Sequence, residues 1–426
     1  MSQVARQVCG GCGAIVPLEA GLVFRCPNAD TDAGEHVLRR VVPLPTDLGD
    51  PGELNPFVRF RRRLLAWHRA HQAGWSDARF VALVEQLDAA VAAVDGTGFR
   101  FTPLGRFPAL DAATGVATWV KDDTRNVSGS HKARHLFGVL LELEVAHALG
   151  LGPERQTPLA IASCGNAALA GAVVARAAER PIRVFIPTDA NPKVVARLRS
   201  LGAEVVVCER RTGEVGDPCY LRFREAVDRG ALPFCCQGPD NGLCIQGGET
   251  LAWELLAGLD ARQVALDALY VQVGGGALGS AMVSAWTDAV QAGLVSRLPR
   301  FRMVQTEAVA PLEHAWRRIT AEPLGLRRAR AHRAQVMSPW SEPGHSAAHG
   351  ILDDETYDWL ALVEGMLASG GAPVVVDEVT VLAAAELGPR ATGISVDPTG
   401  TSGLAGLLAA RPLGGEVGVL FTGGLR

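Results

Sequence analysis

The sequence predicts an α/β protein with two lobes, mainly parallel sheets and a small N-terminal appendage. Two series of alternating strand and helix signals carry this prediction, one over residues 159–208 and the other starting at residue 268. Their connections are short, as in successive βαβ units, which form parallel sheets. Ligands of such sheets bind outside the carboxyl ends of the strands, so we expect a cleft between the lobes.

The elements follow in order along the chain. Residues 1–45 contain three cysteines among Gly and Pro and show little helical periodicity, whereas residues 55–94 carry apolar residues at helical spacing. A strand at 118–121 and an amphipathic helix at 131–149 come next. We expect a segment at 1–45, a catalytic unit at 46–426, and within it a smaller βαβ lobe at about 130–255. The expected strands of the two series are Leu159–Ala162, 183–187, 203–208, Ala268–Val273, Phe301–Gln305 and Val417–Phe421.

The composition of the chain limits the kinds of protein that it could be. The chain has 426 residues, 48% hydrophobic residues and a formal net charge of -4, which excludes disorder and disfavours a nucleic-acid surface. No signal peptide and no long apolar run is visible, so we expect a cytoplasmic protein without membrane contact. Nine cysteines without a secretory signal are better interpreted as thiols than as disulfides.

The most informative residue is Lys132, which opens a helix directly after the turn Ser-Gly-Ser. The helix dipole disfavours a cation at this position, where acidic side chains are the usual choice, so a lysine here is unusual. A helix start helps to keep an amine deprotonated and able to form an imine. The alternative is a solvated lysine at a helix end.

Three further turns lie where ligands bind in α/β sheets. Ser163-Cys164-Gly165-Asn166 precedes an alanine-rich helix, whose amide groups can hold a carboxylate; the alternative is an ordinary helix cap. Gly274-Gly275-Gly276-Ala277-Leu278 follows an apolar strand and can bring its backbone close to a phosphate. By itself it could equally be a nucleotide loop. Thr422 ends the last strand and could be a simple turn residue.

Together these stretches resemble fold type II pyridoxal-phosphate enzymes, the group of threonine synthase, serine and threonine dehydratases, cysteine synthase and the tryptophan synthase β chain. The resemblance rests on SGSHK at 128–132, SCGN at 163–166, GGGALG at 274–279, Thr-Gly-Gly at 422–424, and on 248–255 and 396–407. The Ser-His-Lys form is closest to the tryptophan synthase β chain. Ala133 stands where many relatives have an acid.

The resemblance implies a role for each of these residues. Lys132 would be the Schiff-base lysine and general base, His131 would touch the cofactor phosphate, and Asn166 would bind the pyridoxal hydroxyl. Residues Ser163, Cys164 and Gly165 would seat the substrate carboxylate, and residues 274–278 would hold the phosphate. Thr422 would face the pyridine nitrogen, where a neutral hydroxyl favours elimination or replacement over transamination. His131 could instead be a helix-start residue bonded to backbone.

These features favour a threonine-synthase-like lyase or synthase that acts on a hydroxy-amino acid or its phosphate ester. The carboxylate turn lacks the acid that the tryptophan synthase β chain has there. Two alternatives stay open: a β-replacement enzyme that makes a specialised amino acid from a serine derivative, and a regulatory protein that binds the cofactor without turnover. The resemblance also implies a homodimer. His345, His349, Asp353 and Asp354 are interpreted as a solvated loop rather than a metal site.

The N-terminal segment resembles a zinc ribbon of the kind that some threonine synthases carry. Cys9, Cys12 and Cys26 supply three thiols at suitable spacing, and His36 could complete a tetrahedral site. The alternative is a vestigial ribbon with reduced thiols that binds nothing.

Overall fold

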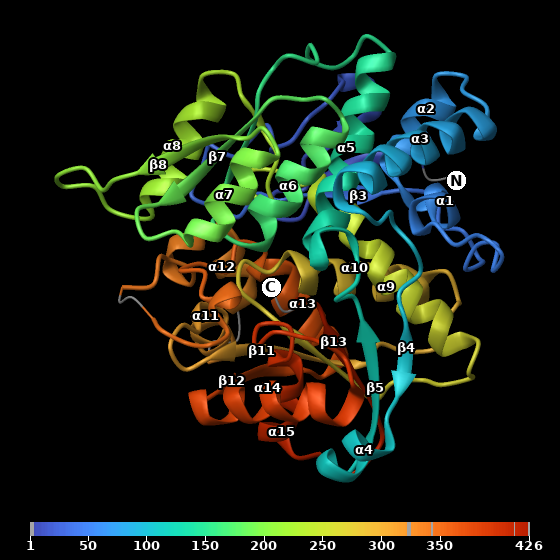
Figure 1. Ribbon diagram of the computed structural model, residues 1–426, viewed down its shortest axis with the longest axis vertical. Coiled ribbons are helices and arrows are strands. Elements are labelled where there is room, and N and C mark those ends of the chain that lie inside the picture. The colour runs from blue at the N-terminus through green and yellow to red at the C-terminus, as the bar shows by residue number, and fades with distance from the viewer. Residues whose placement is uncertain (1–3, 322–324, 342–343, 413, 425–426) are drawn as a thin grey trace.

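The computed structural model describes residues 4–321, 325–341, 344–412 and 414–424. Their strands form a four-stranded, a six-stranded and a small three-stranded sheet. Figure 1 shows the two larger sheets in two lobes, one above the other, with the N-terminal segment beside the upper lobe. The predicted α/β fold with mainly parallel sheets is confirmed.

The upper lobe is built on a parallel sheet with the strand order β8-β7-β6-β9. The expected strand Leu159–Ala162 is found with the predicted bounds, and the next two strands differ from prediction by one residue. The elements are β6 (Leu159–Ala162), α6 (Asn166–Ala177), β7 (Ile182–Pro187), α7 (Pro192–Ser200), β8 (Glu204–Cys208), α8 (Pro218–Asp228) and β9 (Leu232–Pro233).

Three helices from the N-terminal part of the chain pack in the same core, which therefore includes residues outside the 130–255 interval. Phe57, Phe99 and Phe137 form a cluster of edge and tilted ring contacts at their junction, with centroids 4.6–4.9 Å apart. The helices are α1 (Pro56–Arg59), α2 (Leu65–Gln72) and α3 (Asp77–Asp95).

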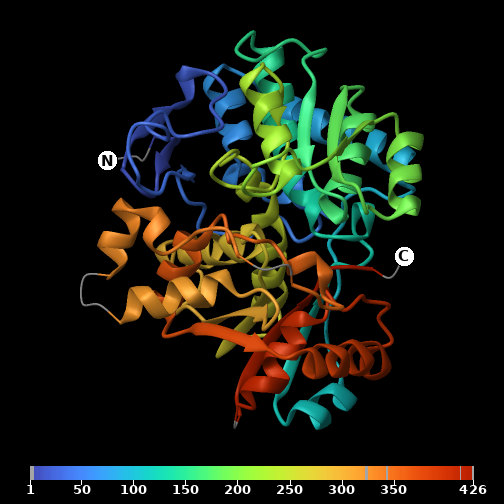
Figure 2. The same ribbon diagram turned by 90° about the vertical axis from the view of Figure 1, so that its left-hand side faces the viewer.

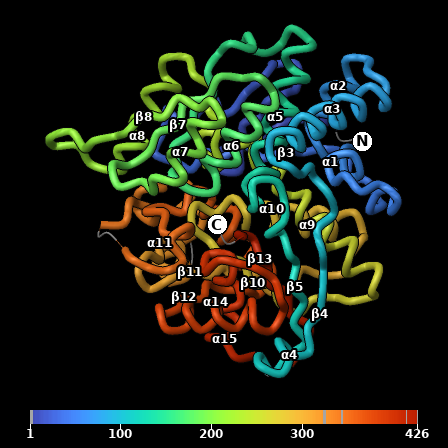
Figure 3. The backbone as a smooth tube through the Cα atoms, viewed as in Figure 1, coloured from blue at the N-terminus to red at the C-terminus, as the bar shows by residue number. Residues whose placement is uncertain are grey.

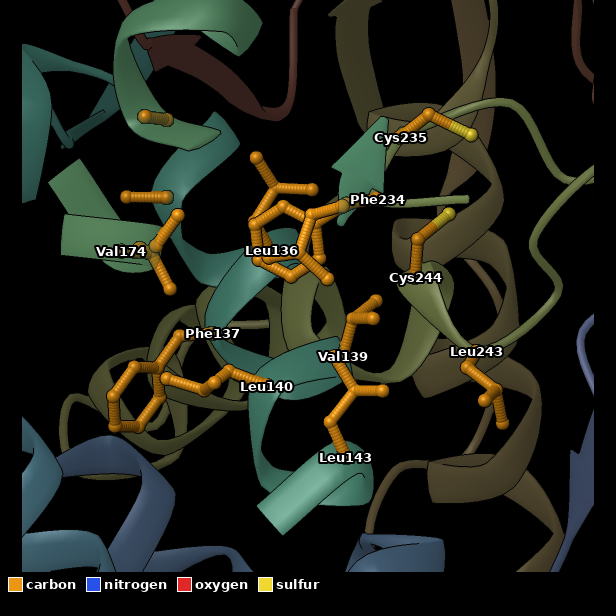
Figure 4. Packing of buried hydrophobic residues seen from close by; sticks show 14 of the residues in the cluster. Leu136, Phe137, Val139, Leu140, Leu143, Val174, Phe234, Cys235, Leu243 and Cys244 are labelled. Atoms are coloured by element: carbon orange, nitrogen blue, oxygen red, sulfur yellow. The ribbon is translucent and has the colours of Figure 1, made fainter. Parts of the chain in front are cut away.

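Helix α5 (Lys132–Ala148) is the centre of this lobe. The sequence pattern predicted one apolar face, but every residue from Ala133 to Ala146 is buried, because α2, α6 and α9 (Cys244–Asp260) surround the helix. Figure 4 shows Leu136, Val139 and Leu143 of α5 in this cluster, near the side chain of Cys244 at the start of α9.

The lower lobe contains the order β12-β11-β10-β13-β5-β4, in which only β4 is antiparallel. Strand β13 lies between β10 and β5 and, among the strands that the structure describes, is the one that pairs with both. The strands are β4 (Leu104–Arg106), β5 (Ala117–Asp122), β10 (Ala268–Gln272), β11 (Arg300–Thr306), β12 (Ala372–Val376) and β13 (Glu416–Phe421). The helices are α4 (Pro108–Thr114), α10 (Ala277–Gln291), α11 (Pro311–Thr320), α12 (Gly325–Ala331), α13 (Trp359–Ser369), α14 (Glu378–Thr392) and α15 (Ser402–Ala410).

The backbone tube shows how the chain passes from one lobe to the other, leaving β5 below and entering α5 above (Figure 3). Lys132 is the first residue of α5 and so lies at this crossing. Within the described ranges, no helix combines the length and the apolar character that crossing a bilayer requires.

The N-terminal segment forms an antiparallel sheet of β1 (Arg6–Cys9), β2 (Ile15–Pro17) and β3 (Leu38–Val41). In Figure 2 it lies above the orange helices of the lower lobe. Glu35 connects the two parts: its amide donates to the Arg330 carbonyl at 2.8 Å, and its carboxylate accepts from the Trp359 indole. The segment therefore contacts α12 and α13 as well as the upper lobe.

Candidate active site

Lys132 is positioned by a turn that is joined to the end of the last strand. Ser128 and Gly129 have left-handed backbone angles (φ 57° and 60°), which turn the chain sharply before α5. Ser130 forms a β-bridge with Gly423, and the Gly424 amide donates to the Gly129 carbonyl at 3.0 Å. The residues on either side of Lys132 and Thr422 are thus fixed against each other.

His131 is a neutral residue of the same turn. Burial lowers its pKa well below the ordinary value, and the positive charge of Lys132 adds to the effect. The imidazole forms a hydrogen bond with the Thr422 backbone, and its Nδ1 has no partner among the described residues. A buried nitrogen of this kind could bind a phosphate oxygen or another ligand.

The Thr422 side chain is buried and its hydroxyl oxygen accepts a hydrogen bond from Gln272 Nε2 at 2.6 Å. The hydroxyl hydrogen is therefore left to donate to another group. Gln272 ends β10, so neighbouring strands of the sheet hold the donor and the acceptor in place. Thr422 can offer a ring nitrogen a neutral hydrogen bond without protonating it.

Residues 163–166 form the turn between β6 and α6, as the sequence predicted. Helix α6 has no side-chain cap, so its first amide groups are not satisfied by the usual Ser, Thr or Asp oxygen. A Cβ added at Gly165 would meet no other atom within 4 Å. The Gly165 amide donates to Ser163 Oγ at 3.3 Å and the Ser163 amide to the Phe185 carbonyl at 3.2 Å. The amide groups that suit a carboxylate are therefore those at the start of α6, next to the open space at Gly165.

The glycine turn between β10 and α10 packs against the segment that follows residue 350. Gly276 has φ 100°, which favours glycine, and a Cβ at Gly274 would come within 2.1 Å of an Asp353 carboxylate oxygen. Ala277 and Leu278 begin α10, where free amide groups and the helix dipole favour an anion. The turn has the properties of a phosphate site.

The expectation of a solvated loop is wrong for Asp353. Its side chain is partly buried, and one carboxylate oxygen accepts a hydrogen bond from the Gly275 amide at 2.8 Å. Burial raises the pKa of Asp353, while the nearby charge of Lys132 lowers it. Asp353 therefore connects the glycine turn with the lysine, which no sequence motif had indicated.

Asp358 is a second acid that sequence reasoning missed. It is 2% exposed, and neither carboxylate oxygen has a side-chain hydrogen-bond partner within the described part of the chain. Burial raises its pKa to about 7, and the charge of Glu35 contributes. In the sequence Asp358 belongs to a polar run, DDETYD, that is typical of an exposed loop. Only the packing of Tyr357 and Asp358 on the glycine turn distinguishes it from an exposed loop residue.

We expect the variant Asp358→Asn to be more stable than the original chain at neutral pH. A carboxyl whose pKa is raised on folding binds its proton more tightly in the native state than in the unfolded state. The free energy of unfolding of the original chain therefore falls as pH rises from about 4 to about 7, where the buried group must lose that proton. The stability difference should grow across this window by on the order of 4 kcal/mol. Urea unfolding at several pH values measures it, and Asp228→Asn, an exposed acid on α8, is the control. A difference that does not change with pH would contradict the expectation.

The four N-terminal residues proposed as metal ligands lie together, with all four ligand atoms within 4.8 Å of one another. Cys12 Sγ and Cys26 Sγ are 3.6 Å apart, and Cys9 Sγ is 3.7 Å from His36 Nδ1. A tetrahedral zinc ion with bonds of ~2.3 Å requires ligand separations of about 3.8 Å, so the donor set fits. His36 Nε2 is 2.9 Å from Asp32 Oδ1, which leaves Nδ1 for a metal.

Comparison with known proteins identifies the group to which this arrangement belongs. The family described as "Pyridoxal-phosphate dependent enzyme" matches residues 97–423, which include Lys132, both amide-rich turns and Thr422. The chain is a member of this family. Pyridoxal-phosphate-dependent enzymes need an amine for the aldehyde, donors for a phosphate and a partner for the ring nitrogen. Lys132, the glycine turn and the Thr422 hydroxyl fit these needs.

Individual pyridoxal-phosphate enzymes are similar over large parts of the chain. A threonine synthase of Mycobacterium leprae is 27% identical over 311 residues, covering 72% of this chain and 75% of the relative. An L-serine dehydratase of Saccharomyces cerevisiae is 28% identical over 193 residues, covering 44% of this chain and 56% of the relative. Among solved structures, a threonine deaminase from T.th. has a TM-score of 0.59 with 25% identity and covers 80% of this chain and 98% of its own.

Proposed function

We propose that the protein is a threonine-synthase-like enzyme that eliminates or replaces a leaving group on a hydroxy-amino acid or its phosphate ester. The single observation that carries the proposal is the position of Lys132 at the start of α5, after a turn that the Ser130–Gly423 bridge joins to the strand end carrying Thr422. An amine for the aldehyde and a neutral hydroxyl for the ring nitrogen thereby come from joined segments, and the glycine turn supplies the amides for a phosphate. The similarity to a threonine synthase supports the choice of reaction.

Each residue has a role in this proposal. When bound, pyridoxal phosphate supplies the electron sink that makes the substrate α-proton acidic. The Lys132 amine would hold the cofactor and then remove that proton as a general base. The turn at residues 163–165 would seat the substrate carboxylate against the amides at the start of α6, and Asn166 would bind the pyridoxal hydroxyl. Thr422 would donate to the ring nitrogen, and the free Nδ1 of His131 would face the phosphate.

Asp353 gives the phosphate site an additional property. Its carboxylate already uses the Gly275 amide, one of the donors that the phosphate needs. Two anions at one donor repel each other, so the phosphate would displace Asp353 or require its protonation. We expect Asp353 to turn away from Gly275 when the cofactor is bound.

Steady-state and spectroscopic assays of the purified protein test the proposed reaction. Serine, threonine, homoserine and their O-phospho and O-acetyl esters would be added to the cofactor-loaded protein, with visible absorbance and free phosphate as readouts. We expect phosphate release from O-phosphohomoserine together with formation of a new amino acid. A cofactor-loaded protein whose absorbance responds to none of these compounds would contradict the proposal and favour the non-catalytic alternative.

Elimination without replacement is the second candidate, because an L-serine dehydratase and a threonine deaminase are among the similar proteins. Formation of a 2-oxo acid and ammonia from serine or threonine would distinguish it from the first. A β-replacement reaction would instead require an added nucleophile before serine derivatives are consumed.

Zinc at Cys9, Cys12, Cys26 and His36 is part of the proposal. Three thiolates and one imidazole are a frequent donor set for structural zinc, and the Asp32 carboxylate would orient the imidazole. A closed four-ligand site leaves no position for substrate, so the metal would hold the segment together rather than take part in the reaction. The homodimer stays a prediction that sedimentation can test.

A further inference from the structure

Directly behind the first turn of α5 lies a buried cluster of four charged side chains. Arg134 Nη2 is 2.8 Å from Asp123 Oδ1, Arg134 Nη1 is 2.7 Å from Glu254 Oε1, and Lys121 Nζ is 2.6 Å from Glu254 Oε2. All four side chains are at most 1% exposed. Two cations and two anions leave the cluster without net charge.

The cluster joins the elements that hold Lys132. Lys121 lies on β5, Asp123 follows that strand, Arg134 lies on α5 and Glu254 on α9. Arg134 is two residues from Lys132, so an anchored guanidinium restrains the turn that carries the amine. Thr250 of α9 adds a hydrogen bond of 3.2 Å to Arg134 Nη1.

Backbone contacts hold the turn before Lys132, and the ion pairs of Arg134 add a side-chain restraint just after it. Helix α5 has no side-chain cap, and its first turn rests closely on α9: a Cβ at Gly247 would lie 2.1 Å from the Arg134 carbonyl oxygen. Such close packing brings the first turn of α5 against α9, so that the Arg134 side chain can reach Glu254. The ion pairs, which are directional, supply that restraint.

Stability alone explains the cluster poorly, because burial raises the pKa of Asp123 and lowers that of Lys121 and so opposes both charges. Buried ion pairs lose much of their attraction to desolvation, and apolar residues of similar volume often replace them at no cost. Although burial opposes ionisation, Arg134 and Lys121 lower the pKa of Glu254, so the acid is charged at neutral pH. The charges are therefore maintained in the interior for another reason.

We propose that Arg134 is a positioning residue for Lys132, and that the neutral cluster Lys121, Asp123, Arg134 and Glu254 keeps the electrostatic environment of the amine balanced. The inference rests on the proposed function, since it assumes that Lys132 attaches the cofactor.

His131 and His135 on α5, and Asp353 and Asp358 near the glycine turn, also interact electrostatically with the amine, and no variant used below changes them. The inference predicts the sign of the shift in the pH at which the cofactor attaches. Removal of an anion leaves an excess positive charge that disfavours a protonated amine, and removal of a cation has the opposite effect.

The test measures how fast the cofactor attaches to the apo-protein. Visible absorbance follows the attachment, and the measurement is repeated across a pH series. Glu254→Gln should lower the pH midpoint of attachment and Lys121→Met should raise it, each by about half a pH unit. The double variant Lys121→Met/Glu254→Gln restores neutrality and should return the midpoint to that of the original chain. Glu144→Gln, a buried acid on α5 about 18 Å along the helix from Lys132, is the matched control and should cause no shift.

A further variant tests positioning without changing charge. Thr250→Val removes the hydrogen bond that Thr250 Oγ1 accepts from Arg134 and the one that it donates to the Gly247 carbonyl, while it preserves side-chain shape and charge. It should slow attachment several-fold at every pH and leave the midpoint in place. Because this substitution is small and keeps the charge of the cluster, the variant should fold even if Glu254→Gln or Lys121→Met does not.

Shifts of the same sign in Glu254→Gln and Lys121→Met, or unchanged midpoints in both, would overturn the electrostatic part. An unchanged rate in Thr250→Val would overturn the positioning part. If the original chain attaches no cofactor, the proposed function fails; if it attaches the cofactor normally and the variants behave like it, only this inference fails.

Discussion

Replacement of Lys132 by alanine is expected to abolish cofactor attachment and to lower turnover by at least about a thousandfold, because one amine would both hold the cofactor and move the substrate proton. The chain contains only two other lysines, Lys121 and Lys193. Lys121 is enclosed in the buried ion cluster, and Lys193 is exposed on α7. Neither can take over the reaction.

Borohydride reduction followed by peptide mapping measures this directly. In the original chain the label should lie on the peptide that contains residue 132. In Lys132→Ala no lysine should be labelled, while Lys193→Ala, the matched control, should be labelled normally. A label on Lys121 or Lys193 instead would refute the assignment of the site.

The second large effect is expected at the N-terminal segment. Cys26→Ser should reduce bound zinc from about one ion per chain to none and lower the melting temperature, since structural zinc contributes on the order of 10 kcal/mol to the folding of such small units. The core of the segment contains few apolar side chains, namely Cys9, Val16, Cys26 and Leu38, so packing cannot replace the metal. Metal analysis and thermal unfolding provide the measurements.

The control for this change is Cys208→Ser, which alters a buried thiol of the upper lobe far from the ligand set. It should retain the metal. Retention of zinc by Cys26→Ser would mean that the four residues are not the ligands, and a metal-free original chain would favour the vestigial ribbon.

Much of the fold follows from local patterns in the sequence. The strands of the two series and the turns after them could be predicted within one or two residues, because apolar runs and glycine or Asn turns are local signals. The amphipathic pattern of α5 was misleading, since residues 133–146 are enclosed on all sides and Arg134, Glu142 and Glu144 are buried in ion pairs.

The parts of the site that could not be predicted depend on contacts between distant segments. Asp353 and Asp358 lie in a polar run that is typical of exposed loops, yet both pack on a turn about eighty residues earlier in the chain. The link between Arg134 and Glu254 likewise joins residues 120 positions apart. Neither periodicity nor turn chemistry contains information about such pairs.

The place of β13 has a consequence for how the molecule is made. Because this strand comes after all other strands along the sequence yet lies inside the six-stranded sheet, β4 with β5 and β10 with β11 and β12 stay two separate halves until it is inserted. On the ribosome, a nascent chain that stops before residue 416 would expose two apolar strand edges to solvent. Chaperone dependence should therefore be greatest before β13 is added, and the Thr422 hydroxyl would reach the site together with this strand.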